Sequence, residues 1–310
     1  MDGVLVVDKL GGMTSHDVVD LARRSLGERR IGHTGTLDPL ATGVLPLACG
    51  RATRLVRFFL SSDKAYEATI RFGLTTDTYD ITGRELTRST DLPTPEAIEA
   101  ALDTLRGEYL QTPPAYSAKK VGGRRAYALA RQDTPVVLAP VPVRVSRADL
   151  LQCTDESAHV AITCSAGFYV RSFAHALGER VGSGACLEAL RRTRSGDFAL
   201  DEAIDLETLR HGPDASAHMI PLEQLLPGMP AARLSSTGRA RISHGQEVES
   251  SHMLALPSRL EAGAADTPDA DGYTWVRLFD DTGQLVALGR RSAAGPTDES
   301  LALHPAVVLI

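Results

Sequence analysis

The chain has few cysteines and few aromatic side chains, and the spacing of the cysteines excludes classes of protein. Its 310 residues include four cysteines and one tryptophan, and aromatic residues make up 5% of the total. The cysteines form no C-x-x-C pair and have no histidine at zinc-finger spacing. They are Cys49, Cys153, Cys164 and Cys186. This scatter predicts reduced thiols in a cytoplasmic protein. The histidines show no H-E-x-x-H spacing, so we expect no metal site.

Long apolar runs are also missing from the chain. No stretch approaches the roughly 18 residues that a membrane-spanning helix requires, so we expect no contact with a membrane. Residues 1–8 carry an acid where a signal peptide has its basic region, which argues against export. A hydrophobic content of 43% and a charged content of 23% are typical of soluble globular proteins. The length predicts one large domain with a smaller one.

Net positive charge is missing overall, but basic residues are concentrated in parts of the chain. The formal net charge is −6, which argues weakly against a polyanionic partner. Residues 115–147 nevertheless hold seven basic residues and one acid, and residues 21–71 hold nine basic residues and four acids. Residues 261–310 hold three basic and eight acidic residues. Such sorting indicates either a local nucleic-acid contact or an ordinary solvated face, and charge alone does not separate them.

The N-terminal two thirds of the chain mixes strand and helix patterns. Residues 3–8 predict a strand, and Thr14 with Asp17 predicts a capping box for a helix that ends at Gly27. Residues 66–72 alternate as a half-buried strand with Tyr66 on the inward face. A helix is expected from Thr94 to Gly107, and a strand near residues 159–165 is expected to lead into another helix. This mixture without strict alternation favours an α+β fold.

A small β-domain is predicted after residue 230. Residues 273–279 and 284–290 flank the hairpin signal Asp280-Asp281-Thr282-Gly283, and residues 304–310 predict a last apolar strand. Residues 256–272 are rich in Ala, Asp, Gly and Pro, so we expect a flexible loop there. Residues 112–142 combine prolines, glycines and basic residues, which predicts a mobile basic insertion.

Residues 32–43 form the most informative segment, Gly-His-Thr-Gly-Thr-Leu-Asp-Pro-Leu-Ala-Thr-Gly. Its one carboxylate, Asp38, lies among glycines, hydroxyls and small apolar side chains. Three glycines and the fixed φ of Pro39 predict a shaped loop that holds the acid in place. A surface turn in which Asp38 caps the next turn of chain is the favoured interpretation of a single Gly-rich loop, but here it must also explain the adjoining residues.

Four ordered segments resemble the signature segments of the bacterial TruB family of tRNA pseudouridine synthases, which act on the T-arm uridine. These segments are residues 32–43, 50–53, 62–66 and 167–171, and the match extends from Gly3 to about Arg194. The resemblance implies a catalytic domain over residues 1–229, with a mixed, largely antiparallel sheet, flanking helices and the basic insertion. Residues 230–310 then correspond to the β-barrel-like PUA-type RNA-binding domain of that family.

The resemblance also implies roles for individual residues. Asp38 corresponds to the catalytic aspartate, Tyr66 to the residue against the target base, and His33 to part of the loop that displaces this base. Tyr169 and Arg171 correspond to residues beside the aspartate, and Leu190 to a leucine of the uridine pocket. The family needs neither a cofactor nor a metal.

The physical chemistry of these residue types agrees with those roles. An ionised Asp38 can act as a nucleophile at C1′ or C6 of the nucleotide or as the base that removes a 2′ proton, and the sequence leaves this choice open. Arg171 is the expected cationic partner of Asp38, although a solvent-facing position at a helix start is the alternative. Tyr66 and Tyr169 can stack on an extruded base or serve as ordinary core aromatics.

Basic side chains are expected to bind the phosphates of the tRNA T arm. They include Arg54 and Lys119, together with Arg51, Arg57, Arg191, Arg192, Arg194 and the rest of the insertion. A non-catalytic RNA chaperone is the competing interpretation, and a phosphate-transferring enzyme is disfavoured because no G-x-x-x-x-G-K-[ST] segment is present. The insertion and the lack of lysine-rich tails resemble the stand-alone bacterial form, so no guide RNA or obligate protein partner is expected.

Overall fold

The strand and the capped helix that the sequence predicts near the N-terminus are both present. Strand β1 (Gly3–Lys9) is followed by helix α1 (Ser15–Leu26). The Thr14 hydroxyl accepts the Asp17 N–H at 3.1 Å, and the Asp17 carboxylate accepts the Thr14 N–H at 2.7 Å. Gly27 then ends the helix with a left-handed φ of 63°. The predicted capping box and helix end are confirmed.

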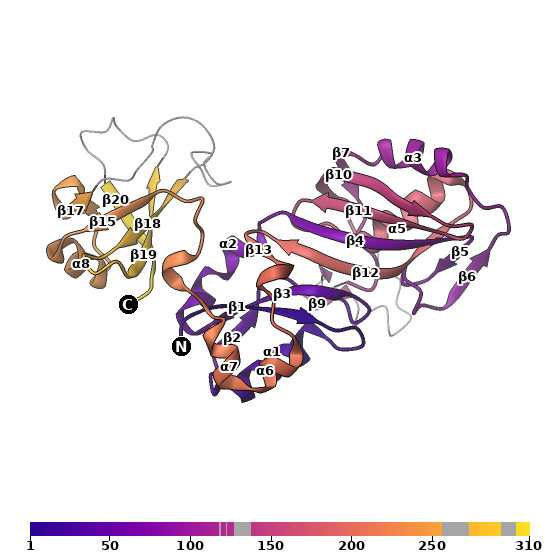
Figure 1. Ribbon diagram of the computed structural model, residues 1–310. Coiled ribbons are helices and arrows are strands. Elements are labelled where there is room, and N and C mark those ends of the chain that lie inside the picture. Colours follow the sequence, from indigo (N-terminus) through magenta and orange to yellow (C-terminus); the bar gives the residue numbers. More distant parts are fainter. Residues whose placement is uncertain (118, 122, 127–137, 256–272, 293–301) are drawn as a thin grey trace.

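The computed structural model describes the chain except for residues 118, 122, 127–137, 256–272 and 293–301. A ten-stranded sheet forms its larger part (Figure 1), in the order β14-β1-β3-β12-β4-β11-β10-β7, with β2 beside β3 and β13 beside β12. Its further strands are β2 (Ile31–His33), β3 (Thr42–Cys49), β4 (Lys64–Phe72), β7 (Gly107–Gln111), β10 (Val141–Cys153), β11 (Ser157–Cys164), β12 (Ala185–Ser195), β13 (Phe198–Ala199) and β14 (Ile220–Pro221). All pairings are antiparallel except β3 with β12, as expected for a mixed, largely antiparallel sheet.

Helices cover this sheet in two groups. Helices α3 (Pro95–Asp103) and α5 (Val170–Val181) pack together and against β10 and β12. Helices α1, α6 (Leu206–Arg210) and α7 (Gly212–Ala217) gather below β1 and β3 in the view of Figure 1. The core between these layers includes Leu45, Ile70 and Phe173, all fully buried. Within the part of the chain that the structure describes, no helix is long and apolar enough to cross a membrane.

One predicted helix end is wrong. Helix α3 ends at Asp103 with Thr104 as its C-cap, and Gly107 instead begins β7 with a left-handed φ of 88°. The last turn of the helix is closed before Gly107. The N–H groups of Thr104 and Leu105 donate to the carbonyls of Ala101 and Leu102, respectively. The glycine therefore redirects the chain into the sheet.

A second sheet follows in the C-terminal part of the chain, in the order β16-β20-β19-β18-β15-β17. Its strands are β15 (Ala231–Leu234), β16 (Val248–Glu249), β17 (Met253–Ala255), β18 (Tyr273–Phe279), β19 (Leu285–Ser292) and β20 (Ala302–Val308), with helix α8 (Ser236–Ser243) beside them. β18 and β19 form the predicted hairpin around Asp280 and Gly283. The flexible loop predicted at residues 256–272 lies outside the described residues.

Shorter elements complete the described chain. They are η1 (Gly50–Leu55), α2 (Val56–Leu60), β5 (Leu74–Thr76), β6 (Glu85–Arg88), β8 (Lys120–Val121), β9 (Arg124–Arg125), η2 (Leu200–Glu202), η3 (Leu222–Gln224) and η4 (Ser250–His252). β8 and β9 pair within the predicted basic insertion. Its mobility stays a prediction, because residues 118, 122 and 127–137 lie outside the described residues.

Arginines of η1 and α2 join the two sheets. Arg51 pairs with Asp2 at 3.0 Å and donates to the Leu309 carbonyl at 2.6 Å. Arg54 donates to the Val308 carbonyl, and the Arg57 guanidinium lies 4.6 Å from the centre of the Trp275 ring. These contacts bring both ends of the sequence to one place. They give the three arginines a structural role besides the expected contact with phosphate.

The close approach of β3 to β12 makes a testable prediction about Gly43. This glycine has φ 99°, and a Cβ on it would lie 2.2 Å from the Arg192 carbonyl oxygen. Gly43→Ala should therefore lower the free energy of unfolding by about 3 kcal/mol or more. Gly27→Ala is the matched control, because its φ of 63° is also left-handed but no atom lies within 4 Å of the added Cβ. We expect it to cost about 1 kcal/mol in urea unfolding, and equal losses would contradict the packing argument.

Candidate active site

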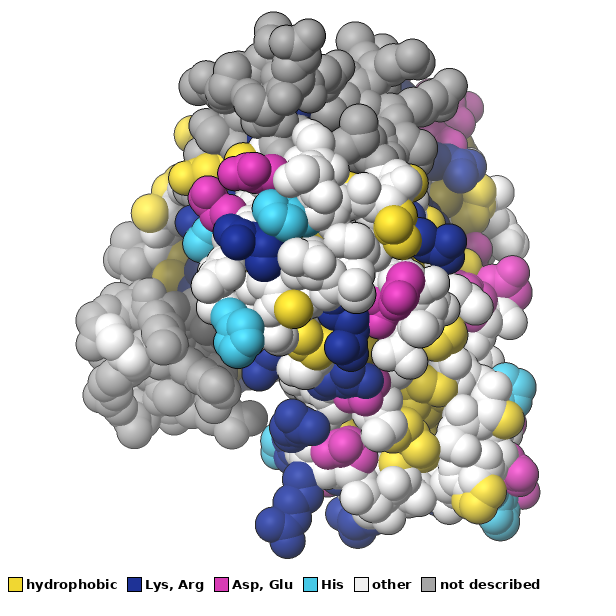
Figure 2. Space-filling model, turned by 90° about the vertical axis from the view of Figure 1, so that its left-hand side faces the viewer, with side chains coloured by type: hydrophobic (Ala, Val, Ile, Leu, Met, Phe, Trp, Pro, Cys, Tyr) yellow, Lys and Arg dark blue, Asp and Glu magenta, His cyan; other side chains and the backbone are white. Residues whose placement is uncertain are grey.

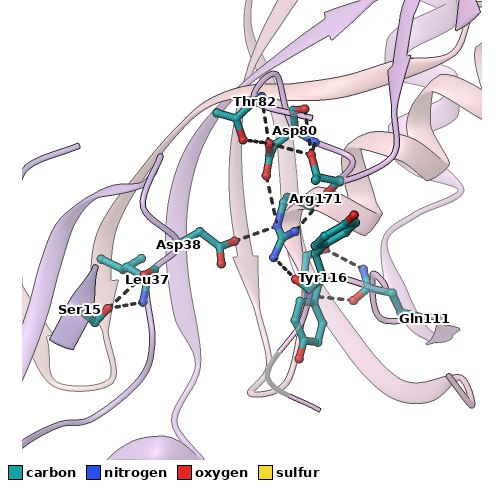
Figure 3. Close-up of polar contacts among 10 residues, drawn as sticks. Ser15, Leu37, Asp38, Asp80, Thr82, Gln111, Tyr116 and Arg171 are labelled. Carbon is teal, nitrogen blue, oxygen red and sulfur yellow. Dashed lines mark hydrogen bonds and ion pairs between the residues drawn. The ribbon is translucent and has the colours of Figure 1, made fainter. Parts of the chain in front are cut away.

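The loop that carries Asp38 connects β2 to β3 and is held by the first residue of helix α1. The Ser15 hydroxyl accepts the Leu37 N–H at 2.8 Å and lies 3.1 Å from the Leu37 carbonyl oxygen, to which it donates (Figure 3). Ser15 is 2% exposed, so water does not compete for these bonds. The peptide unit immediately before Asp38 is thereby fixed against the helix.

The residue after Asp38 is held from the other side. Gly12 donates its N–H to the Pro39 carbonyl at 2.8 Å, and the Lys9 ammonium contacts the same oxygen at 3.4 Å. Lys9 is fully buried and also donates to the carbonyls of Leu10 at 2.9 Å and Met13 at 2.7 Å. Burial lowers the pKa of Lys9 to about 8, and the negative charge of Asp38 acts in the opposite direction.

Arg171, the second residue of α5, binds three segments that are far apart in the sequence. Its Nε donates to Asp38 Oδ2 at 2.8 Å. Its Nη1 donates to the Thr78 carbonyl at 3.1 Å, and its Nη2 donates to the Tyr116 carbonyl at 2.9 Å. The structure thus brings Asp38 and Arg171 together, and the alternative of a solvent-facing Arg171 is excluded.

The two partners of this ion pair differ in exposure. The Arg171 side chain is 7% exposed, whereas the Asp38 side chain is 39% exposed. The cation therefore lies beneath the carboxylate, and the carboxylate is accessible to a bound molecule. A fixed cation in a water-poor position orients an accessible carboxylate without closing it off.

Asp80 is a second carboxylate of the site, and the sequence analysis missed it. Its Oδ1 accepts bonds from the Thr78 hydroxyl at 2.9 Å and from the Thr82 hydroxyl at 2.6 Å and N–H at 3.0 Å. Its Oδ2 lies 3.8 Å from Arg171 Nε (Figure 3). The side chain is 9% exposed, so Asp80 supports Arg171 from the protein side. A Thr-x-Asp-x-Thr spacing around a turn was the available signal.

Tyr66 and Tyr169 both lie within electrostatic reach of Asp38. Tyr66 on β4 is paired with Arg192 in the register of the sheet. Burial raises the pKa of the Tyr66 phenol, Arg192 opposes this, and the negative charge of Asp38 adds to it. Burial also raises the pKa of Tyr169, whose backbone N–H and carbonyl bond to the Gln111 amide at 2.8 and 3.1 Å. Both phenols therefore stay protonated at neutral pH.

The other predicted site residues occupy different places. His33 ends β2, is half-buried, and accepts the Gly35 N–H at 3.4 Å; burial and then Arg192 lower its pKa. Leu190 is 8% exposed and belongs to the same core cluster as Leu37. Arg54 lies at the junction of the two sheets, and Lys119 is exposed at the start of the short β8–β9 hairpin. The described contacts join neither of these two cations to Asp38.

The expectation that Arg192 binds phosphate is wrong. This residue is 1% exposed, and its guanidinium donates to the carbonyls of Val44 at 2.7 Å and Gly35 at 3.1 Å. It fixes the strand and loop on both sides of the Asp38 segment from within. Arg191 pairs with Asp8 through both terminal nitrogens, at 3.1 and 2.7 Å, and remains partly exposed.

Two protein-family models match this chain. Residues 23–170 match the model of the TruB family pseudouridylate synthase N-terminal domain. Residues 171–227 match the model of the tRNA pseudouridylate synthase B C-terminal domain. The chain belongs to the TruB family of pseudouridylate synthases. It is therefore an isomerase that forms pseudouridine, and the resemblance read from the sequence is confirmed.

Individual relatives cover almost the whole chain. The tRNA pseudouridine synthase B of Solibacter usitatus is 43% identical over 296 residues, which are 93% of this chain and 95% of that protein. The enzyme of the same name from Mycobacterium tuberculosis H37Rv is 41% identical over 287 residues, with coverages of 90% and 92%. Among solved structures, the archaeal box H/ACA Nop10–Cbf5 complex matches with a TM-score of 0.73 at 24% identity, over 99% of this chain and 86% of that chain. This last similarity concerns the fold alone.

The support that Asp80 gives to Arg171 leads to a testable prediction. Asp80→Asn keeps an oxygen for Thr82 but removes the negative charge beside the guanidinium. We expect turnover in pseudouridine formation to fall about tenfold, with the affinity for RNA changed by less than about twofold. Asp77→Asn is the matched control in the same loop, because Asp77 binds the Arg84 N–H at 2.8 Å instead. Equal activity of the two variants would show that Asp80 does not act through Arg171.

The shifted pKa of Lys9 predicts a pH dependence of stability. The pKa is about 8 in the folded chain, against an ordinary value of 10.5. Between these values the unfolded state binds more protons, so the contribution of Lys9 to stability rises with pH, by at most about 1.4 kcal/mol per pH unit. Urea unfolding at several pH values should show this rise relative to Lys9→Met. Lys64, whose pKa is also about 8, is present in both proteins and cancels. Parallel curves for the two proteins would contradict the prediction.

Proposed function

We propose that this enzyme converts the T-arm uridine of tRNA, U55, to pseudouridine without a cofactor, using Asp38 as the essential carboxylate. The observation that carries the proposal is the ion pair of a buried Arg171 with an accessible Asp38, 2.8 Å apart. The relatives named tRNA pseudouridine synthase B support tRNA as the substrate. The choice of the T arm rests on the signature segments of the sequence.

The chemistry of the reaction suits a site with one accessible carboxylate. The N1 glycosidic bond of the uracil breaks, the base turns within the site, and a bond from C5 to C1′ of the ribose forms. C5 loses its proton and N1 gains one, so no atom is gained or lost overall. Asp38 can act as a nucleophile or as a base in this sequence, and in either role it must be ionised. Arg171 donates a hydrogen bond to this carboxylate at 2.8 Å and thereby orients it. The aromatic faces of Tyr66 and Tyr169 provide stacking surfaces for an extruded base.

Cationic side chains outside the site support contact with the RNA backbone. Figure 2 views the molecule from the side of the C-terminal sheet. It shows Lys and Arg side chains gathered on the lower part of this face. Exposed arginines lie in the last turn of α1, in the segment between α1 and β2, and on η1 and α2. They are Arg24, Arg29, Arg30, Arg54 and Arg57. Phosphate contacts of this kind position a nucleic acid and weaken with added salt.

We further propose that the enzyme acts without a guide RNA or an obligate protein partner. The curated relatives that cover most of the chain carry the name of a single enzyme, tRNA pseudouridine synthase B. The basic insertion at residues 112–142 offers the chain its own cationic segment. A stand-alone enzyme needs such contacts because it must recognise the folded RNA itself.

The direct test is incubation of the purified chain with an unmodified tRNA transcript, followed by chemical mapping of pseudouridine. We expect modification at the T-arm uridine with EDTA present and no other macromolecule added. Asp38→Asn should lower the rate by at least about a hundredfold while tRNA binding stays within about twofold.

A matched control keeps this test specific. Asp63→Asn changes an acid that pairs with Arg144 at 3.0 Å in an exposed position, and it should leave the rate unchanged. An active Asp38→Asn variant would remove the proposed role of this residue. Modification at another uridine would correct the proposed substrate position, and tRNA folding activity without pseudouridine would favour the chaperone interpretation.

A further inference from the structure

The turn at residues 77–83 supplies two of the contacts of Arg171 and has an unusual backbone. It contains the Thr78 carbonyl, which accepts from Arg171, and the Asp80 carboxylate. Between them, Tyr79 adopts φ 63°, a left-handed conformation that a residue with a large side chain rarely takes. A conformation of this kind persists only when its surroundings hold it.

Two backbone bonds attach this turn to strand β12. The Leu187 N–H donates to the Tyr79 carbonyl at 2.9 Å, and the Ile81 N–H donates to the Leu187 carbonyl at 2.8 Å. These bonds fix the turn at one edge. They do not by themselves determine how the turn faces helix α5, because both bonds are made to the same residue of the sheet.

Besides the contacts of Arg171, a ring stack between Tyr79 and His175 attaches the turn to α5. The ring centres lie 4.0 Å apart and the planes differ by 6°. His175 follows Arg171 by four residues, so one face of the helix presents both the guanidinium and the imidazole to the same turn.

The imidazole acts here through its face. Its Nδ1 is buried and has no hydrogen-bond partner among the described residues. Burial lowers the pKa of His175, against the charge of Glu179, so the stacked ring is neutral at neutral pH. A neutral ring with an unbonded nitrogen gains little from this position except packing on Tyr79.

We propose that Tyr79 and His175 form a positioning pair, whose stacking holds the turn so that Thr78 and Asp80 keep Arg171, and through it Asp38, in place. This inference rests on the proposed function of the site. Neither ring is assigned a contact with the reacting nucleotide. Direct contact of Tyr79 with the RNA is the competing role, and it predicts a different kinetic effect.

The test compares variants at Tyr79 that separate the ring from the backbone. Tyr79→Gly adopts φ 63° without strain but has no ring, whereas Tyr79→Phe keeps the ring and loses the hydroxyl. Single-turnover measurement on a tRNA transcript with saturating enzyme should show a rate roughly three- to tenfold lower for Tyr79→Gly and a normal rate for Tyr79→Phe. The dissociation constant for tRNA should be unchanged in both.

The partner ring gives the reciprocal variants. His175→Ala should be as slow as Tyr79→Gly, and His175→Phe should restore most of the rate because a flat ring is kept. The double variant Tyr79→Gly with His175→Ala should be no slower than either single variant, since both remove the same interaction. Additive losses would show that the two residues act separately.

A readout that does not need catalysis distinguishes this inference from the proposed function. Hydrogen exchange of the Ile81 and Leu187 amides should be faster in Tyr79→Gly and His175→Ala, and normal in the two Phe variants. Unchanged exchange together with unchanged rates would overturn the positioning pair. A weaker tRNA affinity with a normal saturated rate would assign Tyr79 to RNA contact instead. If the unaltered chain forms no pseudouridine, the proposed function fails, and the exchange result still decides whether the pair holds the turn.

Discussion

The site depends on the burial of one guanidinium. A buried arginine is tolerated only when its donors find acceptors, because an unpaired buried charge is costly. Arg171 meets this condition with acceptors from three segments: the Asp38 loop, the turn at residues 77–83 and the start of the basic insertion at Tyr116. The Ser172 hydroxyl, bonded to the Thr112 carbonyl at 2.8 Å, ties the same helix turn to that insertion. Displacement of any one segment therefore weakens the placement of the other two.

Position and accessibility are provided by different parts of the site. Asp38 is fixed mainly through the peptide units beside it, by Ser15 on Leu37 and by Gly12 and Lys9 on Pro39. Its side chain can therefore remain 39% exposed although its position is fixed. Burial is confined to the cation, where it keeps water from competing for the donors. The carboxylate is thereby held in position and yet open to an incoming molecule.

The sequence predicted what depends on neighbouring residues. The capping box of Thr14 and Asp17, the left-handed Gly27 and the hairpin at Asp280 follow from short-range geometry, and each was found. The pairing of Asp38 with Arg171 followed from the family resemblance and the need for a counter-charge. Asp80 was missed because its partner is distant in sequence and a single acid in a turn is common. Arg192 was misjudged because a count of charges does not show which side chains are buried, and Arg192 is 1% exposed.

The same limitation applies to the arginines of η1 and α2. In a 3-10 helix residues three apart share a face, and Arg51 and Arg54 both use that face to bind carbonyls of the last residues of the chain. Arg57 adds a stack on Trp275, beside the edge-to-face contact of Phe58 with the same ring. Three of the basic residues between residues 21 and 71 thus connect the two sheets. An acidic chain of net charge −6 consequently has less free cationic surface than its sequence suggests. Arg24 and Arg29, which lie outside this junction, remain exposed.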